Sequence, residues 1–125
     1  MNGDVLIYIG SAVVFLWGAA HLFPTKSIVE GFGDISDDNR RIITMEWIAE
    51  GIALCFAGVL PAAVTILAGA DDRTSVIVYL LTAGFLAVMA LVAFCAGRKT
   101  SIIPIKVCPL VLVISAVLFV LGSIV

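Results

Sequence analysis

Charged residues are scarce in this chain of 125 residues: they make up 13% of it, while 62% of the residues are hydrophobic. Soluble domains average about 25% charged and about 45–50% apolar residues. The composition, with a mean hydropathy of +1.22, therefore excludes a water-soluble globular protein, and it is too apolar for a disordered one. The net charge of −2 gives no reason to expect nucleic acid as a partner. The partner that the composition predicts is the lipid bilayer.

Polar interruptions are few, and between them lie four apolar runs, at about 5–23, 42–68, 75–96 and 102–125. Each run has about the 20 residues that a transmembrane helix needs, whereas a barrel strand alternates over about 10 residues. We therefore expect an all-α membrane protein, a four-transmembrane-helix bundle that forms one domain over 1–125. Pro24 ends the first span, Pro104 is typical of a first helical turn, and Pro109 predicts a kink.

Only one connection is long, the segment 24–41 between the first two spans. Ser27 and Glu30 match a capping-box pattern, but the two glycines that follow are expected to end any helix quickly. Ser36 or Asp37 is the expected N-cap of the second long helix. The other two connections are short polar turns, at 71–73 and 97–100.

Basic residues are missing from the first four positions, so the first span does not resemble a cleaved signal peptide, and we expect it to be retained. Of the seven Lys and Arg residues, only Arg73 lies at the second connection. The other six flank the first and third connections: Lys26, Arg40, Arg41, Arg98, Lys99 and Lys106. Basic loops stay cytoplasmic, which predicts a multi-pass protein of the cell (inner) membrane with both termini extracytoplasmic. This bias argues against a dual-topology small multidrug transporter.

Cysteine motifs are absent: Cys55, Cys95 and Cys108 form no Cys-x-x-Cys pair, which argues against a redox relay. Each cysteine is expected to behave as a small hydrophobe. The chain has a single histidine and no second ligand motif, so no metal site is predicted. No cofactor follows from the sequence.

Two carboxylates lie inside the second span, at Glu46 and Glu50. A charge near the centre of a transmembrane helix costs at least about 2.5–3.5 kcal/mol, and such residues usually face the bundle interior or water. Residues four apart share a helical face, and Ala49, Ala53 and Ala57 supply the small residues that close helix packing needs. We expect both carboxylates to point into the bundle.

His21 lies at the same end of the first span, close in depth to Glu46. The interpretation is a polar ligand-binding pocket toward the first connection, formed by Glu46, Glu50, His21, Trp47, Trp17 and Arg41. Structural alternatives remain for each member. His21 suits an interfacial hydrogen bond to a carbonyl, Glu46 suits a surface pair with Arg41 or Lys26, and Glu50 suits a polar contact between helices.

Three classes of function fit such a pocket. The first is binding, with transport as an extension, of a small molecule or a proton, for which a homo-oligomer supplies the room that alternating access requires. The second is a lipid-modifying enzyme in which Glu and His transfer a proton. Its His-x-x-Pro segment at 21–24 resembles sterol-isomerase-type membrane proteins. No catalytic residue is assigned. The third is a structural accessory subunit.

The segment Gly18-Ala19-Ala20-His21-Leu22-Phe23-Pro24 closes the first span, a polar loop follows, and Glu46 comes early in the second span. This layout resembles the DoxX-like group of small bacterial four-span membrane proteins. The resemblance implies the four-span architecture. Members of that group largely lack an assigned activity, so it implies no particular chemistry.

Overall fold

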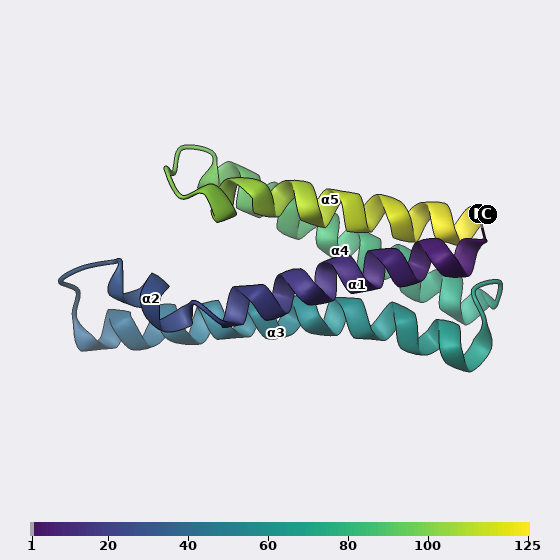
Figure 1. Ribbon diagram of the computed structural model, residues 1–125, viewed down its shortest axis with the longest axis horizontal. Coiled ribbons are helices and arrows are strands. Elements are labelled where there is room, and N and C mark those ends of the chain that lie inside the picture. Colours follow the sequence, from purple (N-terminus) through teal and green to yellow (C-terminus); the bar gives the residue numbers. More distant parts are fainter. Residues whose placement is uncertain (1) are drawn as a thin grey trace.

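The computed structural model describes residues 2–125, in which helices are the only regular secondary structure (Figure 1). Four of these helices are long and apolar enough to cross a membrane, which confirms the predicted all-α four-helix bundle. The elements in this range are α1 (Gly3–Leu22), α2 (Thr25–Glu30), α3 (Asp37–Ala68), α4 (Arg73–Gly97) and α5 (Ile103–Ile124).

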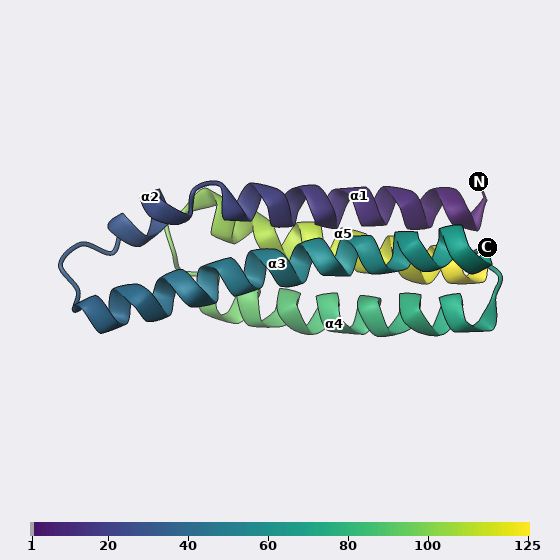
Figure 2. The same cartoon turned by 90° about the horizontal axis from the view of Figure 1, so that it is seen from below.

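The four long helices form a ring in which α1 packs against α3 and α5, and α4 packs against the same two helices. Figure 2 shows α1 and α4 on opposite sides, with α3 and α5 between them. The chain reverses direction at each connection, so both termini lie at one end of the bundle (Figure 1). The first and third connections, which carry or flank six of the seven basic residues, lie at the other end.

The helix α3 begins at Asp37, before the apolar run predicted to start at residue 42, so the long connection is shorter than 24–41. Its N-cap is Ser36, one of the two predicted candidates, and the Ser36 hydroxyl oxygen accepts a hydrogen bond from the Asn39 N–H at 3.2 Å. Asp37 and Asp38 in the first turn favour the helix N-terminus. Because the first turn of α3 is polar, a prediction based on apolar runs does not include it.

The remainder of the first connection contains the short helix α2, which packs against α3. Ser27 lies inside α2 and does not cap it, because the helix begins two residues earlier at Thr25. The helix ends at Glu30, and the Gly31 N–H donates to the Ser27 carbonyl at 3.1 Å. Val29 is the residue of α2 that is buried. At the third connection, α5 begins at Ile103 with Pro104 in its first turn, as predicted.

The closest approach of α1 and α3 occurs at glycines. A Cβ on Gly18 would lie 2.7 Å from the Cys55 nitrogen, and a Cβ on Gly58 would lie 2.7 Å from the Ser11 carbonyl oxygen. The helices therefore touch along the face of α3 that carries Gly51 and Gly58. The predicted alanine stripe is wrong in register, since Ala49 is exposed and only Ala57 is buried. Because glycine has no side chain, the backbones of α1 and α3 can approach each other closely, and this contact sets the rotation of α3.

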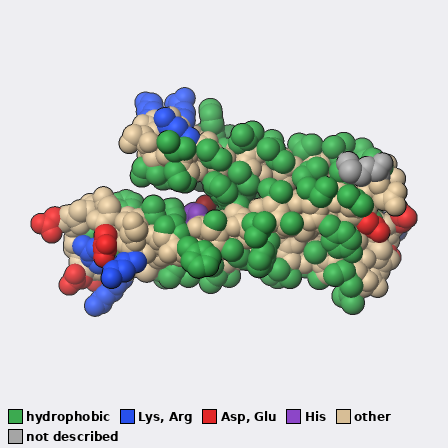
Figure 3. Space-filling view, viewed as in Figure 1, with side chains coloured by type: hydrophobic (Ala, Val, Ile, Leu, Met, Phe, Trp, Pro, Cys, Tyr) green, Lys and Arg blue, Asp and Glu red, His purple; other side chains and the backbone are tan. Residues whose placement is uncertain are grey.

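The bundle is tightly closed at the end that holds the termini. Gly122 of α5 meets Ile7 of α1, where an added Cβ would lie 2.6 Å from the Ile7 side chain. On the opposite side, the buried Thr65 and Tyr79 hydroxyls of α3 and α4 are hydrogen-bonded at 2.6 Å. At the other end, the α1–α3 pair separates from the α4–α5 pair, and Figure 3 shows a cleft between them.

Candidate functional site

The cleft has the chain's single histidine at its inner end, visible in purple in Figure 3. His21 belongs to the last turn of α1. Its Nε2 lies 3.6 Å from the Glu50 Oε2 of α3, a distance that allows an ion pair when the imidazole is protonated. The two side chains are 11% and 33% exposed, so both are withdrawn from the surface while Glu50 stays accessible. The cleft therefore ends on a carboxylate and an imidazole from two neighbouring helices.

Hydrogen bonding at this pair is incomplete. The distance of 3.6 Å exceeds that of a nitrogen–oxygen hydrogen bond, and the His21 Nε2 is buried without a hydrogen-bond partner in the described part of the chain. The other ion pair found there, Lys26–Glu30 at 3.9 Å, lies on the exposed surface of α2. Buried polar atoms usually have partners, so the His21–Glu50 pair has bonding capacity left for a third group.

Trp47 holds the imidazole in place. Its ring stacks on the His21 ring with centroids 3.9 Å apart and planes 14° from parallel. The Trp47 Nε1–H also donates to the His21 carbonyl oxygen at 2.7 Å. The indole thus contacts both the backbone and the side chain of His21. Its position one turn from Glu50 on α3 lets a single helix supply both the stacking ring and the carboxylate.

Trp17 extends the polar site one turn deeper along α1. It is partly buried against the apolar core, and among the residues that the structure covers its buried Nε1–H has only the weak acceptor offered by the Cys108 sulfur beside it. The Cys108 side chain of α5 lies beside Trp17 and within electrostatic range of Glu50. The site is therefore bounded by three helices, α1, α3 and α5, and holds a second polar group, the Trp17 N–H, whose sulfur partner is weak.

Sequence reasoning treated Cys108 as a small hydrophobe and left it out of the site. The residue is indeed buried, at 7% exposure. One signal in the sequence matches its place: Trp17 lies five residues before the end of α1 at Leu22, and Cys108 lies five residues after the start of α5 at Ile103. Depth alone does not reveal which faces of two helices meet, so this neighbour appears only in the structure.

Two of the predicted site residues lie apart from this cluster. Glu46 and Arg41 are exposed, and neither forms an ion pair within residues 2–125. Lys26 pairs with Glu30 instead of Glu46. Because α3 turns its glycine face toward α1, Glu50 comes to the edge of the contact, whereas Glu46 is rotated farther away. The predicted set of six thus divides into His21, Glu50, Trp47 and Trp17 on one side and this exposed pair on the other.

The arrangement suits recognition of a polar group within an apolar site. A carboxylate accepts hydrogen bonds or holds a cation, and the Trp17 N–H donates to an acceptor. No cluster of three or more His, Cys, Asp or Glu residues able to hold a metal ion occurs in the described chain.

The fold and its four long apolar helices are those of a multi-pass helical membrane protein. Comparisons with protein-family models, with curated proteins and with solved structures find no match.

Proposed function

We propose that this membrane protein binds a small molecule with a cationic or hydrogen-bond-donating group, which occupies the cleft and contacts Glu50. The observation that carries the proposal is the half-buried Glu50 carboxylate, whose described charge partner, His21, lies 3.6 Å away without a hydrogen bond. Ionisable groups inside the membrane are costly and usually serve a function. A bound cation or donor would supply the interaction that Glu50 lacks.

The aromatic residues favour the same class of ligand. Trp47 of α3 stacks on His21, Trp17 lies one turn before His21 on α1, and an indole face attracts cations. The Trp17 N–H, which in the described chain has only the weak Cys108 sulfur beside it, adds a donor for an acceptor on the ligand. Recognition of one cation and one acceptor by Glu50 and Trp17 would distinguish such a ligand from the acyl chains that surround the bundle.

The cleft opens at the end that the six clustered basic residues flank. The positive-inside rule supports a cytoplasmic opening, with both termini outside the cell membrane. Four spans of one orientation leave little room for alternating access. Transport of the ligand or of a proton would therefore require a homo-oligomer of this chain. The DoxX-like resemblance supports the same four-span architecture and carries no activity with it.

The test uses a matched pair of probes, benzyltrimethylammonium and its uncharged isostere neopentylbenzene, with purified protein in neutral detergent. The cation is expected to raise the melting temperature of the wild-type protein, and the isostere is not. In the Glu50→Gln variant, which keeps the size of the side chain, loss of a charge-assisted contact should weaken binding about 10- to 100-fold. Glu46→Gln is the control, since Glu46 is exposed and unpaired in the described chain.

Two results would contradict binding at Glu50. The first is an equal shift for the cation in the wild-type and Glu50→Gln proteins. The second is unfolding of Glu50→Gln in the absence of any probe, which would make the carboxylate a structural contact between helices and support the accessory-subunit alternative.

A second candidate, proton transfer within a lipid-like substrate, is favoured by the unpartnered Nε2 of His21 beside the Glu50 carboxylate. An acid and a base at this separation can act on one bound molecule. Catalysis predicts that His21→Ala abolishes turnover of a membrane lipid while the cation still binds. If His21→Ala loses cation binding and the wild-type protein shows no detectable lipid turnover, the function is binding and not catalysis.

A further inference from the structure

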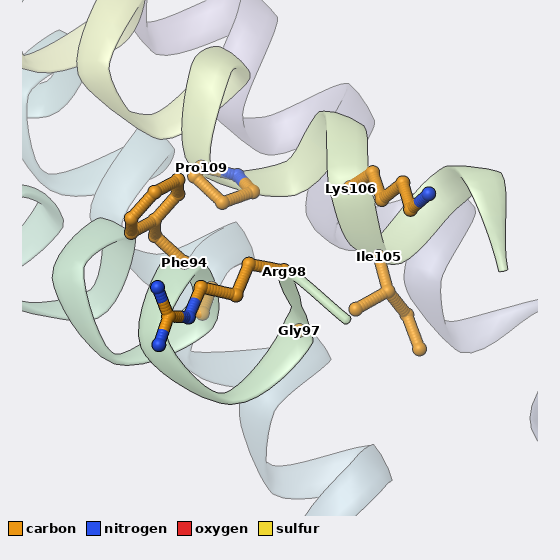
Figure 4. A pocket seen from close by; sticks show the side chains of 7 residues that line it. Phe94, Gly97, Arg98, Ile105, Lys106 and Pro109 are labelled. Atoms are coloured by element: carbon orange, nitrogen blue, oxygen red, sulfur yellow. The ribbon is translucent and has the colours of Figure 1, made fainter. Parts of the chain in front are cut away.

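A second groove, of about 230 Å³, lies between the end of α4 and the beginning of α5, on the opposite arm of the cleft from His21. Its floor is apolar, and its rim carries two cations. Figure 4 shows Phe94 and Pro109 close together with Arg98 beside them, while Lys106 extends outward from α5. The lining residues are Ala93, Phe94, Gly97, Arg98, Ile105, Lys106 and Pro109.

The cations of this groove have no neutralising partner on their own helices. The segment 74–125 contains no Asp or Glu, so Arg98, Lys99 and Lys106 face no carboxylate from α4 or α5. None of the three forms an ion pair within residues 2–125. In Figure 3 this arm of the cleft shows Lys and Arg but no carboxylate, whereas the opposite arm carries both signs.

The position of the groove places these charges at the membrane surface. Arg98 directly follows the last residue of the apolar helix α4, and Lys106 lies in the first turns of α5. The N-terminus of the 22-residue helix α5 adds a partial positive charge at the same point. An apolar floor that continues into the bilayer and a cationic rim at headgroup level complement an amphiphile with a negative head.

We propose that this groove binds an anionic phospholipid, with the headgroup phosphate on Arg98, Lys106 adding positive charge farther along the rim, and an acyl chain over Phe94 and Pro109. Arg supplies a planar fork that matches phosphate oxygens, and Lys supplies a mobile point charge. The proposal stands on residues other than Glu50 and His21. Its failure and the failure of the proposed cation binding are therefore separate results.

The test measures binding of phosphatidylglycerol to the purified protein by native mass spectrometry, with phosphatidylcholine as the zwitterionic comparison. Arg98→Gln is matched by Arg73→Gln, the same substitution at the exposed beginning of α4 at the opposite end of the bundle. Loss of one cationic contact should weaken phosphatidylglycerol binding about 5-fold, and Arg98→Gln with Lys106→Gln about 30-fold. Arg73→Gln should leave binding unchanged.

Three outcomes would overturn the proposal: equal binding of the two lipids, equal losses in Arg98→Gln and Arg73→Gln, or competition by inorganic phosphate at concentrations near those of the lipid. The last result would identify a phosphate site without a lipid chain. Phe94→Ala gives a further readout, because it leaves the cations in place and should shorten the residence of the lipid without abolishing its preference for a negative head. If the double variant does not fold, the single variants Arg98→Gln and Lys106→Gln, each expected to lose about 5-fold, decide.

Discussion

The Trp47 indole of α3 closes the end of α1 by donating its N–H to the His21 carbonyl oxygen at 2.7 Å. The last carbonyls of a helix lack partners within the helix, and Pro24, which follows α1, has no N–H to donate. The neighbouring Leu22 carbonyl accepts from the Thr25 hydroxyl at 2.6 Å. The same indole stacks on the His21 ring, so one residue both ends a helix and orients the candidate site.

Replacement of Trp47 by Phe should therefore separate these two roles. Phenylalanine keeps an aromatic face for His21 but cannot donate to its carbonyl oxygen. We expect the free energy of unfolding to fall by about 1 kcal/mol, measured by titration with sodium dodecyl sulfate in mixed micelles. Trp47→Ala, which removes the stacked ring as well, should cost more. Equal losses in the two variants would show that the hydrogen bond accounts for the whole effect.

Gly18 should be intolerant of even one methyl group. An added Cβ would meet backbone atoms of α3 at 2.7 Å and 2.9 Å, which cannot move without separating the two helices. Overpacking of this kind costs about 1–3 kcal/mol, and it should also weaken cation binding because His21 lies one turn farther along α1. The melting temperature of Gly18→Ala, in detergent, measures the first effect.

The matched control is Gly84→Ala on α4, where an added Cβ would meet nothing within 4 Å. Alanine is the better helix former, so this variant should melt at or above the wild-type temperature. A similar loss of stability in both variants would mean that close approach of α1 and α3 is not what Gly18 provides.

The sequence predicted the four spans and an N-cap at Ser36 or Asp37, because each depends on local chemistry. It placed His21 at the depth of Glu46, whereas the structure pairs His21 with Glu50, one turn deeper. It did not predict the rotation of α3. Large apolar side chains lie on both the exposed and the buried sides of this helix, and the contact face depends on where backbone can touch backbone, at Gly51 and Gly58. That rotation separates Glu46 from Glu50.

The contact between Trp17 and Cys108 is equally beyond the sequence. It joins the first and last spans, 91 positions apart, and its existence depends on how the α4–α5 pair docks on α1. Apart from its depth, nothing in the sequence marks Cys108 as a neighbour of Trp17, since an apolar helix tolerates a cysteine on any face. Neighbours across a bundle follow from tertiary packing, which local pattern does not encode.

Tyr79 should stabilise the closed end of the bundle through its hydroxyl. The residue is fully buried, and its hydroxyl is hydrogen-bonded to the Thr65 hydroxyl of α3 at 2.6 Å. Tyr79→Phe should cost about 0.6 kcal/mol and at most about 1.7 kcal/mol, the range for hydrogen bonds between membrane helices. The loss stays small because Thr65 keeps its bond to the Pro61 carbonyl oxygen at 2.7 Å.

The control for Tyr79 is Tyr8→Phe, which removes the same hydroxyl from a tyrosine that is 40% exposed on α1. It should leave the unfolding titration unchanged. A cost for Tyr8→Phe equal to that of Tyr79→Phe would indicate a general effect of losing a hydroxyl, not an α3–α4 contact.

Sidedness follows from the basic residues and can be measured with two single cysteines. Asp71→Cys in the second connection should react with a membrane-impermeant maleimide from outside the cell, and Ser101→Cys in the third should react only after the membrane is opened. Asp71 is preferred to Asp72, because the Asp72 carboxylate caps α4 by accepting from the Thr74 N–H at 2.8 Å. Both substitutions are made in a chain whose native cysteines are replaced by alanine, so that every label reports the introduced residue. The opposite pattern of labelling would place the cleft and its Glu50 on the outer side of the membrane, and labelling of both cysteines from outside would mean that the chain inserts in two orientations.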